Sequence, residues 1–172
     1  MSENKIINKE DITLYSQIVM ILTVFVLVKM YSIYGGLEIA LITVPIIGIA
    51  AIEDMAKYRI STITLLLLVI VTPMSLLTYF SLDTIMNLSV LLILVTMTRK
   101  NKLLSKADVL VLILVATVCR VNMFSFVIIM MSATILYIQK RYKVSKISLI
   151  PSIYVAFCIT IQFYTQLNTL LR

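Results

Sequence analysis

The chain has 172 residues, of which 61% are hydrophobic and only 13% are charged. A soluble domain is about 45–50% apolar and about 25% charged, so this composition excludes an ordinary water-soluble globule. The net charge of +7 does not indicate nucleic-acid binding, because so apolar a chain has no soluble basic surface to carry it.

Charged or turn-forming residues divide the sequence into seven apolar runs, and each run is a candidate membrane-spanning helix. The fold predicted from them is an all-α, polytopic membrane bundle of six to seven transmembrane helices, because several runs are short for a span. Residues 1–14 are expected to form a polar, cytoplasmic N-terminal tail, and residues 15–172 a single transmembrane domain. The runs are Tyr15–Tyr34, Leu37–Ile52, Ser61–Phe80, Ile85–Thr98, Leu103–Cys119, Asn122–Ile138 and Ile147–Leu167.

Basic residues are distributed unevenly over the connections between these runs. Twelve of the fifteen Lys and Arg residues lie in the N-terminal tail and in alternate connections, at residues 57–59, 99–106 and 140–146. Cytoplasmic loops of membrane proteins are enriched in Lys and Arg, which places the tail and these three connections in the cytoplasm. The predicted location is therefore the cytoplasmic membrane, with several spans and the C-terminus outside. The first run is expected to be a retained helix, since no small-residue cleavage site marks it as a signal peptide.

The residue types needed for several kinds of site are missing. The chain has no His, and its two cysteines, Cys119 and Cys158, lie far apart within apolar runs. A zinc site needs more soft ligands at closer spacing, so we expect no metal and no cofactor.

Carboxylates are thus the candidates for catalysis. Of the eight, Glu53, Asp54 and Asp108 each lie where an apolar run meets a basic connection. An acidic side chain at membrane depth is energetically costly and usually faces a polar cavity or a partner. Asp108 also has a structural interpretation, in which it pairs with Lys106 or caps the start of a helix.

The sequences around two of these acids resemble the aspartate motifs of the type IV prepilin peptidase family, which includes the archaeal preflagellin peptidases and belongs to the GxGD-type intramembrane aspartyl proteases. In that family the first Asp is followed by a basic stretch and then by Ile-Pro-Asn or a variant. Here Asp54 is followed by Lys57, Arg59 and then Ile60-Ser61-Thr62 at the same spacing.

The second motif of the family is GxGD or GxAD followed by an apolar run, and the segment Ser105-Lys106-Ala107-Asp108-Val109 matches its Ala, Asp and Val. A weaker likeness is Ile147–Pro151, which resembles the late Pro-containing segment of the family. Three departures stand out: Ser105 replaces the first Gly, Ser61-Thr62 replaces Pro-Asn, and Leu110 stands where a Lys is common. The first apolar run has no counterpart in the shortest members of that family.

The resemblance implies a membrane-embedded endopeptidase with Asp54 and Asp108 as catalytic residues. Its substrates would be prepilin-like or preflagellin-like proteins, which carry a short basic leader followed by an apolar helix, and cleavage would occur at the cytoplasmic face of the lipid bilayer. The larger bacterial members also methylate the new N-terminus by means of a cytoplasmic loop with paired cysteines. No connection here can hold such a loop, so methyltransferase activity is not expected.

Two other interpretations remain open from the sequence. The protein could be a small transporter or accessory membrane subunit without enzymatic activity, in which the two aspartates relay protons or pair with Lys. It could also be an intramembrane aspartyl protease of the presenilin type, although the Tyr-Asp motif of those enzymes is missing before Asp54 and Asp108.

Overall fold

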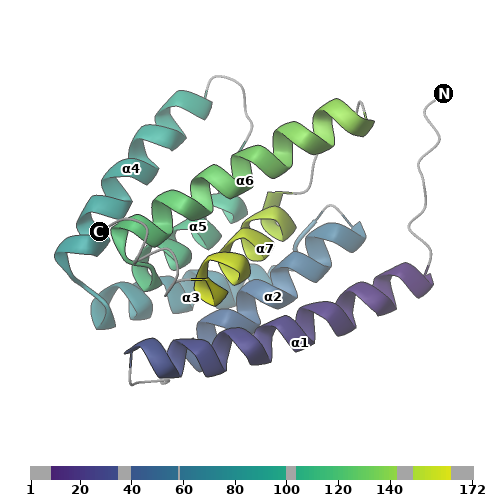
Figure 1. Cartoon of the computed structure of the whole chain (residues 1–172), viewed down its shortest axis with the longest axis horizontal. Coiled ribbons are helices and arrows are strands. Elements are labelled where there is room, and N and C mark those ends of the chain that lie inside the picture. Colours follow the sequence, from purple (N-terminus) through teal and green to yellow (C-terminus); the bar gives the residue numbers. More distant parts are fainter. Residues whose placement is uncertain (1–8, 35–39, 58, 100–103, 143–148, 164–172) are drawn as a thin grey trace.

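The computed structural model describes residues 9–34, 40–57, 59–99, 104–142 and 149–163. These residues form seven α-helices and no strand, which confirms the all-α prediction for this part of the chain (Figure 1). The helices are α1 (Lys9–Tyr34), α2 (Ala40–Lys57), α3 (Thr62–Thr78), α4 (Leu82–Arg99), α5 (Lys106–Val118), α6 (Val121–Tyr142) and α7 (Leu149–Gln162). Each corresponds to one of the seven apolar runs.

Helix α7 lies at the centre of the bundle (Figure 1). It contacts α1, α2, α5 and α6, and α5 in turn packs against α3 and α4. The two short helices α5 and α7 have nearly continuous buried surfaces, which include Leu112, Leu114, Ile153 and Phe157. A helix that is apolar on all sides is expected at such a central position. The core of the protein is therefore built around α5 and α7.

Several helix ends differ from the predicted boundaries: α5 begins at Lys106 and not at Leu103, and α6 ends at Tyr142 and not at Ile138. Helix α1 begins at Lys9, so the last residues of the predicted tail are helical, while residues 1–8 lie outside the described residues. Helix α2 continues beyond Ile52 to Lys57 and so includes Asp54 in its last turn. The difference arises because hydropathy marks the end of an apolar surface, whereas Glu, Asp, Met, Ala and Lys are all compatible with further helix.

Much of the bundle surface is apolar. Large hydrophobic side chains are exposed on α1, α3 and α4, with Ile63 75% and Leu77 84% exposed on α3 alone. Nevertheless, none of the described helices combines the length and hydropathy of a candidate membrane span. A helix needs about 20 residues to cross a bilayer core. Helices α5 and α7 have only 13 and 14 residues. The placement in a membrane thus stays a prediction.

Candidate functional site

Asp54 lies half-buried in the last turn of α2 and faces the start of α7. Its Oδ2 accepts a long hydrogen bond of 3.4 Å from the backbone N–H of Ile150, the second residue of α7. The first N–H groups of a helix have no partner inside the helix, and the positive end of the helix dipole favours a carboxylate there. The bond therefore joins the C-terminal end of α2 to the N-terminal end of α7.

Asp108 lies in the first turn of α5 and is only 5% exposed. It forms a capping box with Ser105: the Ser105 N–H donates to Asp108 Oδ2 at 2.7 Å, and the Asp108 N–H donates to Ser105 Oγ at 3.2 Å. This confirms the capping interpretation of Asp108. A carboxylate can accept about four hydrogen bonds, so the bond from the Ser105 N–H occupies only part of this accepting capacity.

Ser105, which stands where the resembled motif has Gly, caps the start of α5. Its backbone is extended, with φ −79° and ψ 166°, a conformation open to any residue. The side chain is the N-cap of α5, a position at which Ser is among the preferred residues. The departure from Gly is therefore compatible with a normal helix start.

The structure brings the two predicted site residues to the same end of the bundle. Helices α2 and α5 are in contact, and the carboxylates of Asp54 and Asp108 lie within electrostatic interaction range of each other. Both acids also lie next to the start of a helix, Asp54 at α7 and Asp108 at α5. Two carboxylates from different helices are thus held at the same end of the bundle, each by the backbone N–H of its own partner residue.

Glu53, the neighbour of Asp54, has a different environment. Its Oε2 accepts a hydrogen bond of 2.7 Å from the backbone N–H of Ser61, and Ser61 is the N-cap of α3. Ser61 Oγ accepts from the N–H of Thr64 at 3.2 Å. Glu53 therefore links the end of α2 to the start of α3, whereas Asp54 links the end of α2 to the start of α7.

Two tyrosines, one on α7 and one on α1, were not singled out by the sequence. Tyr154 of α7 is fully buried, and its hydroxyl contacts Thr23 Oγ1 at 2.6 Å and donates to the carbonyl of Val19 at 3.2 Å. Gly48 of α2 lies at the same place, where an added Cβ would be 3.3 Å from Thr23 Oγ1. These contacts fix α1, α2 and α7 against one another.

The second tyrosine, Tyr15 of α1, packs against the core but has a different hydroxyl environment. Its Oη is buried and has no hydrogen-bond partner among the described residues. Tyr15 lies within electrostatic interaction range of Asp54 and Cys158. No pattern in the sequence distinguishes this residue from the other eight tyrosines.

A polar residue at the opposite end of the bundle was also missed. Asn87 of α4 is buried, and its Nδ2 donates to the carbonyls of Ala116 and Cys119 at 2.9 and 2.7 Å. The last carbonyls of a helix have no partner inside the helix, so Asn87 stabilises the end of α5. Its role is structural and lies away from the two aspartates.

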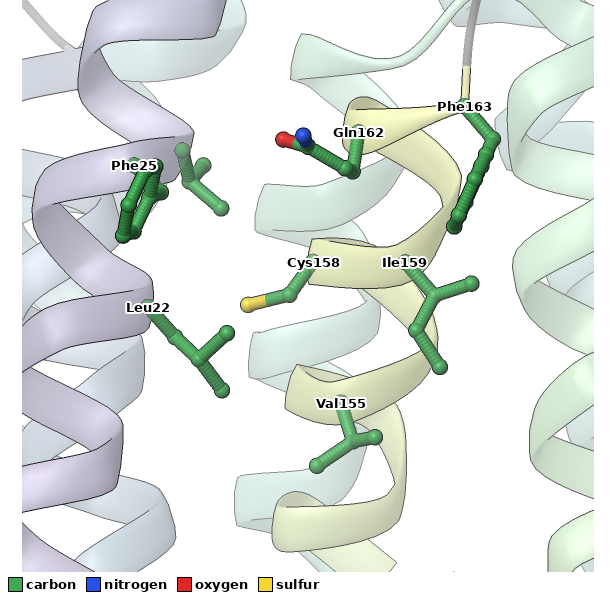
Figure 2. A pocket seen from close by; sticks show the side chains of 8 residues that line it. Leu22, Phe25, Val155, Cys158, Ile159, Gln162 and Phe163 are labelled. Carbon is green, nitrogen blue, oxygen red and sulfur yellow. The ribbon is translucent and has the colours of Figure 1, made fainter. Parts of the chain in front are cut away.

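A pocket of about 290 Å³ lies between α1 and α7 (Figure 2). Figure 2 shows the sulfur of Cys158 directed toward Leu22 of α1. Of the lining side chains, only Cys158 and Gln162 carry polar atoms, so the pocket offers no acid or base for catalysis. A second pocket, of about 260 Å³, contains Asp83 and Arg120 and lies at the end opposite to Asp54.

Comparison with known proteins gives no relative from which to assign the site: no family model, curated protein or solved structure matches the chain. The described residues also contain no group of three or more His, Cys, Asp or Glu that could hold a metal ion.

Proposed function

We propose that this protein is a membrane-embedded aspartyl endopeptidase that cleaves the leader of prepilin-like or preflagellin-like substrates at the cytoplasmic face. The observation that carries the proposal is that Asp54 and Asp108, on the contacting helices α2 and α5, lie at one end of the bundle within electrostatic interaction range of each other. The same two residues are the aspartates of the motif resemblance.

The apolar surface supports a position within a lipid bilayer. Contiguous exposed apolar patches on a soluble monomer rarely exceed a few hundred Å², and larger ones mark membrane or protein contacts. Here exposed Leu, Ile, Val, Met and Phe side chains occur on several helices, notably along α3 and α4. Arg59 and Lys106 are exposed at the end where the two aspartates meet, as expected of a cytoplasmic face.

Two neighbouring carboxylates can hydrolyse a peptide bond without a metal or a covalent nucleophile. Like charges in close proximity do not both ionise readily, so such a pair tends to share one proton. The ionised carboxylate takes a proton from water as the water oxygen attacks the carbonyl carbon, and the protonated one gives its proton to the carbonyl oxygen. The tetrahedral intermediate then collapses as its C–N bond breaks. The departing amine takes up the proton that came from water, and one hydroxyl proton of the intermediate returns to the second carboxylate. Which aspartate begins as the base and which as the acid is a property of the coupled pair and not of either residue alone.

The substrate chemistry follows from the location. A prepilin-like substrate has a basic leader and an apolar helix, and its cleavage point lies where the helix leaves the membrane. Asp54 and Asp108 each lie at the boundary between an apolar helix and basic connecting residues. The peptide bond and the two carboxylates would therefore lie at the same depth.

Cleavage of a synthetic peptide with a basic leader and an apolar helix, by the full chain in detergent micelles, tests the proposal. Asp54→Asn and Asp108→Asn should each abolish cleavage, and the double variant should be no worse than either single one, because the pair acts as a unit. Glu53→Gln is the matched control, since its amide oxygen can still accept from the Ser61 N–H. It should retain substantial activity.

Cleavage by Asp54→Asn or by Asp108→Asn would refute the aspartyl mechanism. Loss of activity in Glu53→Gln together with full activity in Asp54→Asn would show that the neighbouring acid is the catalytic one. An intact protein that leaves the peptide uncut but conducts protons would instead support the transporter interpretation.

A further inference from the structure

A polar pocket at the end of the bundle opposite to the two aspartates has no part in the proposed peptidase reaction. It has a volume of about 260 Å³ and lies where the turn between α3 and α4 meets the turn between α5 and α6. Two side chains of opposite charge, Asp83 and Arg120, belong to its lining. Four hydroxyl side chains also line it: Thr78, Tyr79, Ser81 and Thr117.

The position of Arg120 is an exception to the charge distribution of the chain. Three of the fifteen basic residues lie outside the predicted cytoplasmic tail and connections: Lys29, Arg120 and Arg172. Among these three, Arg120 alone lies in a connection between two apolar runs. The enrichment of Lys and Arg in cytoplasmic loops does not account for a cation at the opposite end. A guanidinium that lines a pocket is well suited to bind phosphate or carboxylate, because it donates two parallel hydrogen bonds.

Four helix ends surround the pocket and favour charges of both signs. Tyr79 is the C-cap of α3 and Cys119 is the C-cap of α5, and both line the pocket. The C-terminal end of a helix favours a cation, and the N-terminal end favours an anion. Asp83 lies in the first turn of α4, whereas the first turn of α6, which follows Arg120, contains no acidic residue. The start of α6 is therefore the favourable place for an anion, and the ends of α3 and α5 beside Asp83 are favourable for a cation.

Hydrogen bonds between helices hold the walls of the pocket in place. Ser75 Oγ and Thr117 Oγ1 are 2.7 Å apart and join α3 to α5. Asn87 Nδ2 donates to the carbonyl of Cys119 at 2.7 Å and joins α4 to the end of α5. Ligand sites in proteins are usually formed before the ligand binds, since this reduces the entropy lost on binding.

The surroundings of the pocket favour a lipid over a free solute as the source of this ligand. Phe80, which lines the pocket, is 68% exposed, and the nearby Leu82 is 74% exposed. Exposed apolar side chains lose contact with water when acyl chains cover them. In the membrane orientation proposed above, this end of the bundle lies at the outer surface, where the headgroups are.

We propose that the pocket binds the headgroup of a zwitterionic phospholipid that carries a phosphate and a primary ammonium group. The phosphate lies at Arg120 and the start of α6, and the ammonium group lies at Asp83 and the ends of α3 and α5. A lipid with a phosphate but no ammonium group would leave Asp83 without a cation. The proposal uses the membrane placement but not the peptidase activity, so either can fail without the other.

The test measures Tm by circular dichroism on the full chain in detergent micelles without lipid, with phosphatidylethanolamine, and with phosphatidylglycerol at the same mole fraction. A ligand that binds only the folded state raises Tm. Phosphatidylethanolamine at about 100 times its Kd should raise the Tm of the wild type by about 5–10 °C, and phosphatidylglycerol by less than about half as much. Free phosphoethanolamine, without acyl chains, is measured in parallel.

Three variants assign the two charges. Arg120→Gln should lose most of the shift with either lipid, because the phosphate loses its partner. Asp83→Asn should give equal shifts with the two lipids, because the carboxylate that distinguishes the ammonium group is gone. Arg59→Gln is the matched control, since it removes an exposed Arg at the opposite end of the bundle, and it should keep the wild-type shifts.

The results that would overturn the proposal are different for each part of it. Equal shifts of the wild type with the two lipids would exclude recognition of the ammonium group. A lower Tm of Arg120→Gln without lipid, together with an unchanged lipid-dependent shift, would show that Arg120 has only a structural role. If free phosphoethanolamine raised Tm as much as phosphatidylethanolamine and both shifts were lost in Arg120→Gln, the ligand would be a soluble zwitterion and the lipid assignment would be wrong.

Discussion

Replacing Asp108 by Asn and by Ala separates its role as a helix cap from its role in catalysis. In the capping box, Asp108 Oδ2 accepts from the Ser105 N–H at 2.7 Å. The amide oxygen of Asn can accept the same bond, whereas Ala cannot. Asp108→Asn also removes a buried negative charge that lies within range of Asp54. Asp108→Asn should therefore be as stable as the wild type or more so, and Asp108→Ala less stable.

The expected size of the difference follows from the cap. Loss of a capping side chain costs about 0.5–2 kcal/mol, typically about 1 kcal/mol. For a chain of this size, about 1 kcal/mol corresponds to a change in Tm of about 2–4 °C. Thermal unfolding in detergent, followed by circular dichroism, measures the difference, and peptide cleavage is assayed on the same samples. Both variants should be inactive. Equal Tm values for the two would show that the capping bond contributes nothing, and activity in Asp108→Asn would refute the catalytic role.

Three further predictions concern packing and topology. Gly48→Leu should lower the free energy of unfolding by about 1–3 kcal/mol, measured by thermal unfolding, because its side chain would collide with Thr23 and separate α1 from α2. Asn87→Asp should be more destabilising than Asn87→Leu in the same assay, since a carboxylate placed beside the carbonyls of Ala116 and Cys119 adds repulsion to the loss of two donors. Reporter fusions should place Arg59 in the cytoplasm and Asp83 outside. If both lie on the same side, the predicted topology is wrong.

The number of helices and the common end of the two aspartates were within reach of the sequence. Apolar runs separated by charged connections predicted six to seven helices, of which the described residues form seven, and the alternation of their directions predicted that Asp54 and Asp108 lie at the same end. The helix ends were less predictable, because hydropathy falls at Glu53 although the helix continues to Lys57. A charged residue ends an apolar surface and not necessarily a helix.

The contacts that complete the site could not be predicted from the sequence. Tyr154 and Thr23 are 131 residues apart, and Ile150 and Asp54 are 96 residues apart. Neither pair forms a motif, because such contacts depend on the register between helices. The hydroxyl of Tyr15 was missed for the same reason: an aromatic residue on an apolar helix has the same sequence pattern whether or not its hydroxyl has a partner.

The hydrogen bond from Ile150 to Asp54 has a consequence for how the protein is made. The ribosome produces α2 and α5, with both aspartates, before it produces α7. Until α7 docks, Asp54 lacks the N–H of Ile150, and the central position among α1, α2, α5 and α6 is empty. A nascent chain therefore carries both acids before the helix that donates to Asp54 is present. Under the proposed function, proteolytic competence would arise only after α7 has been made and has docked.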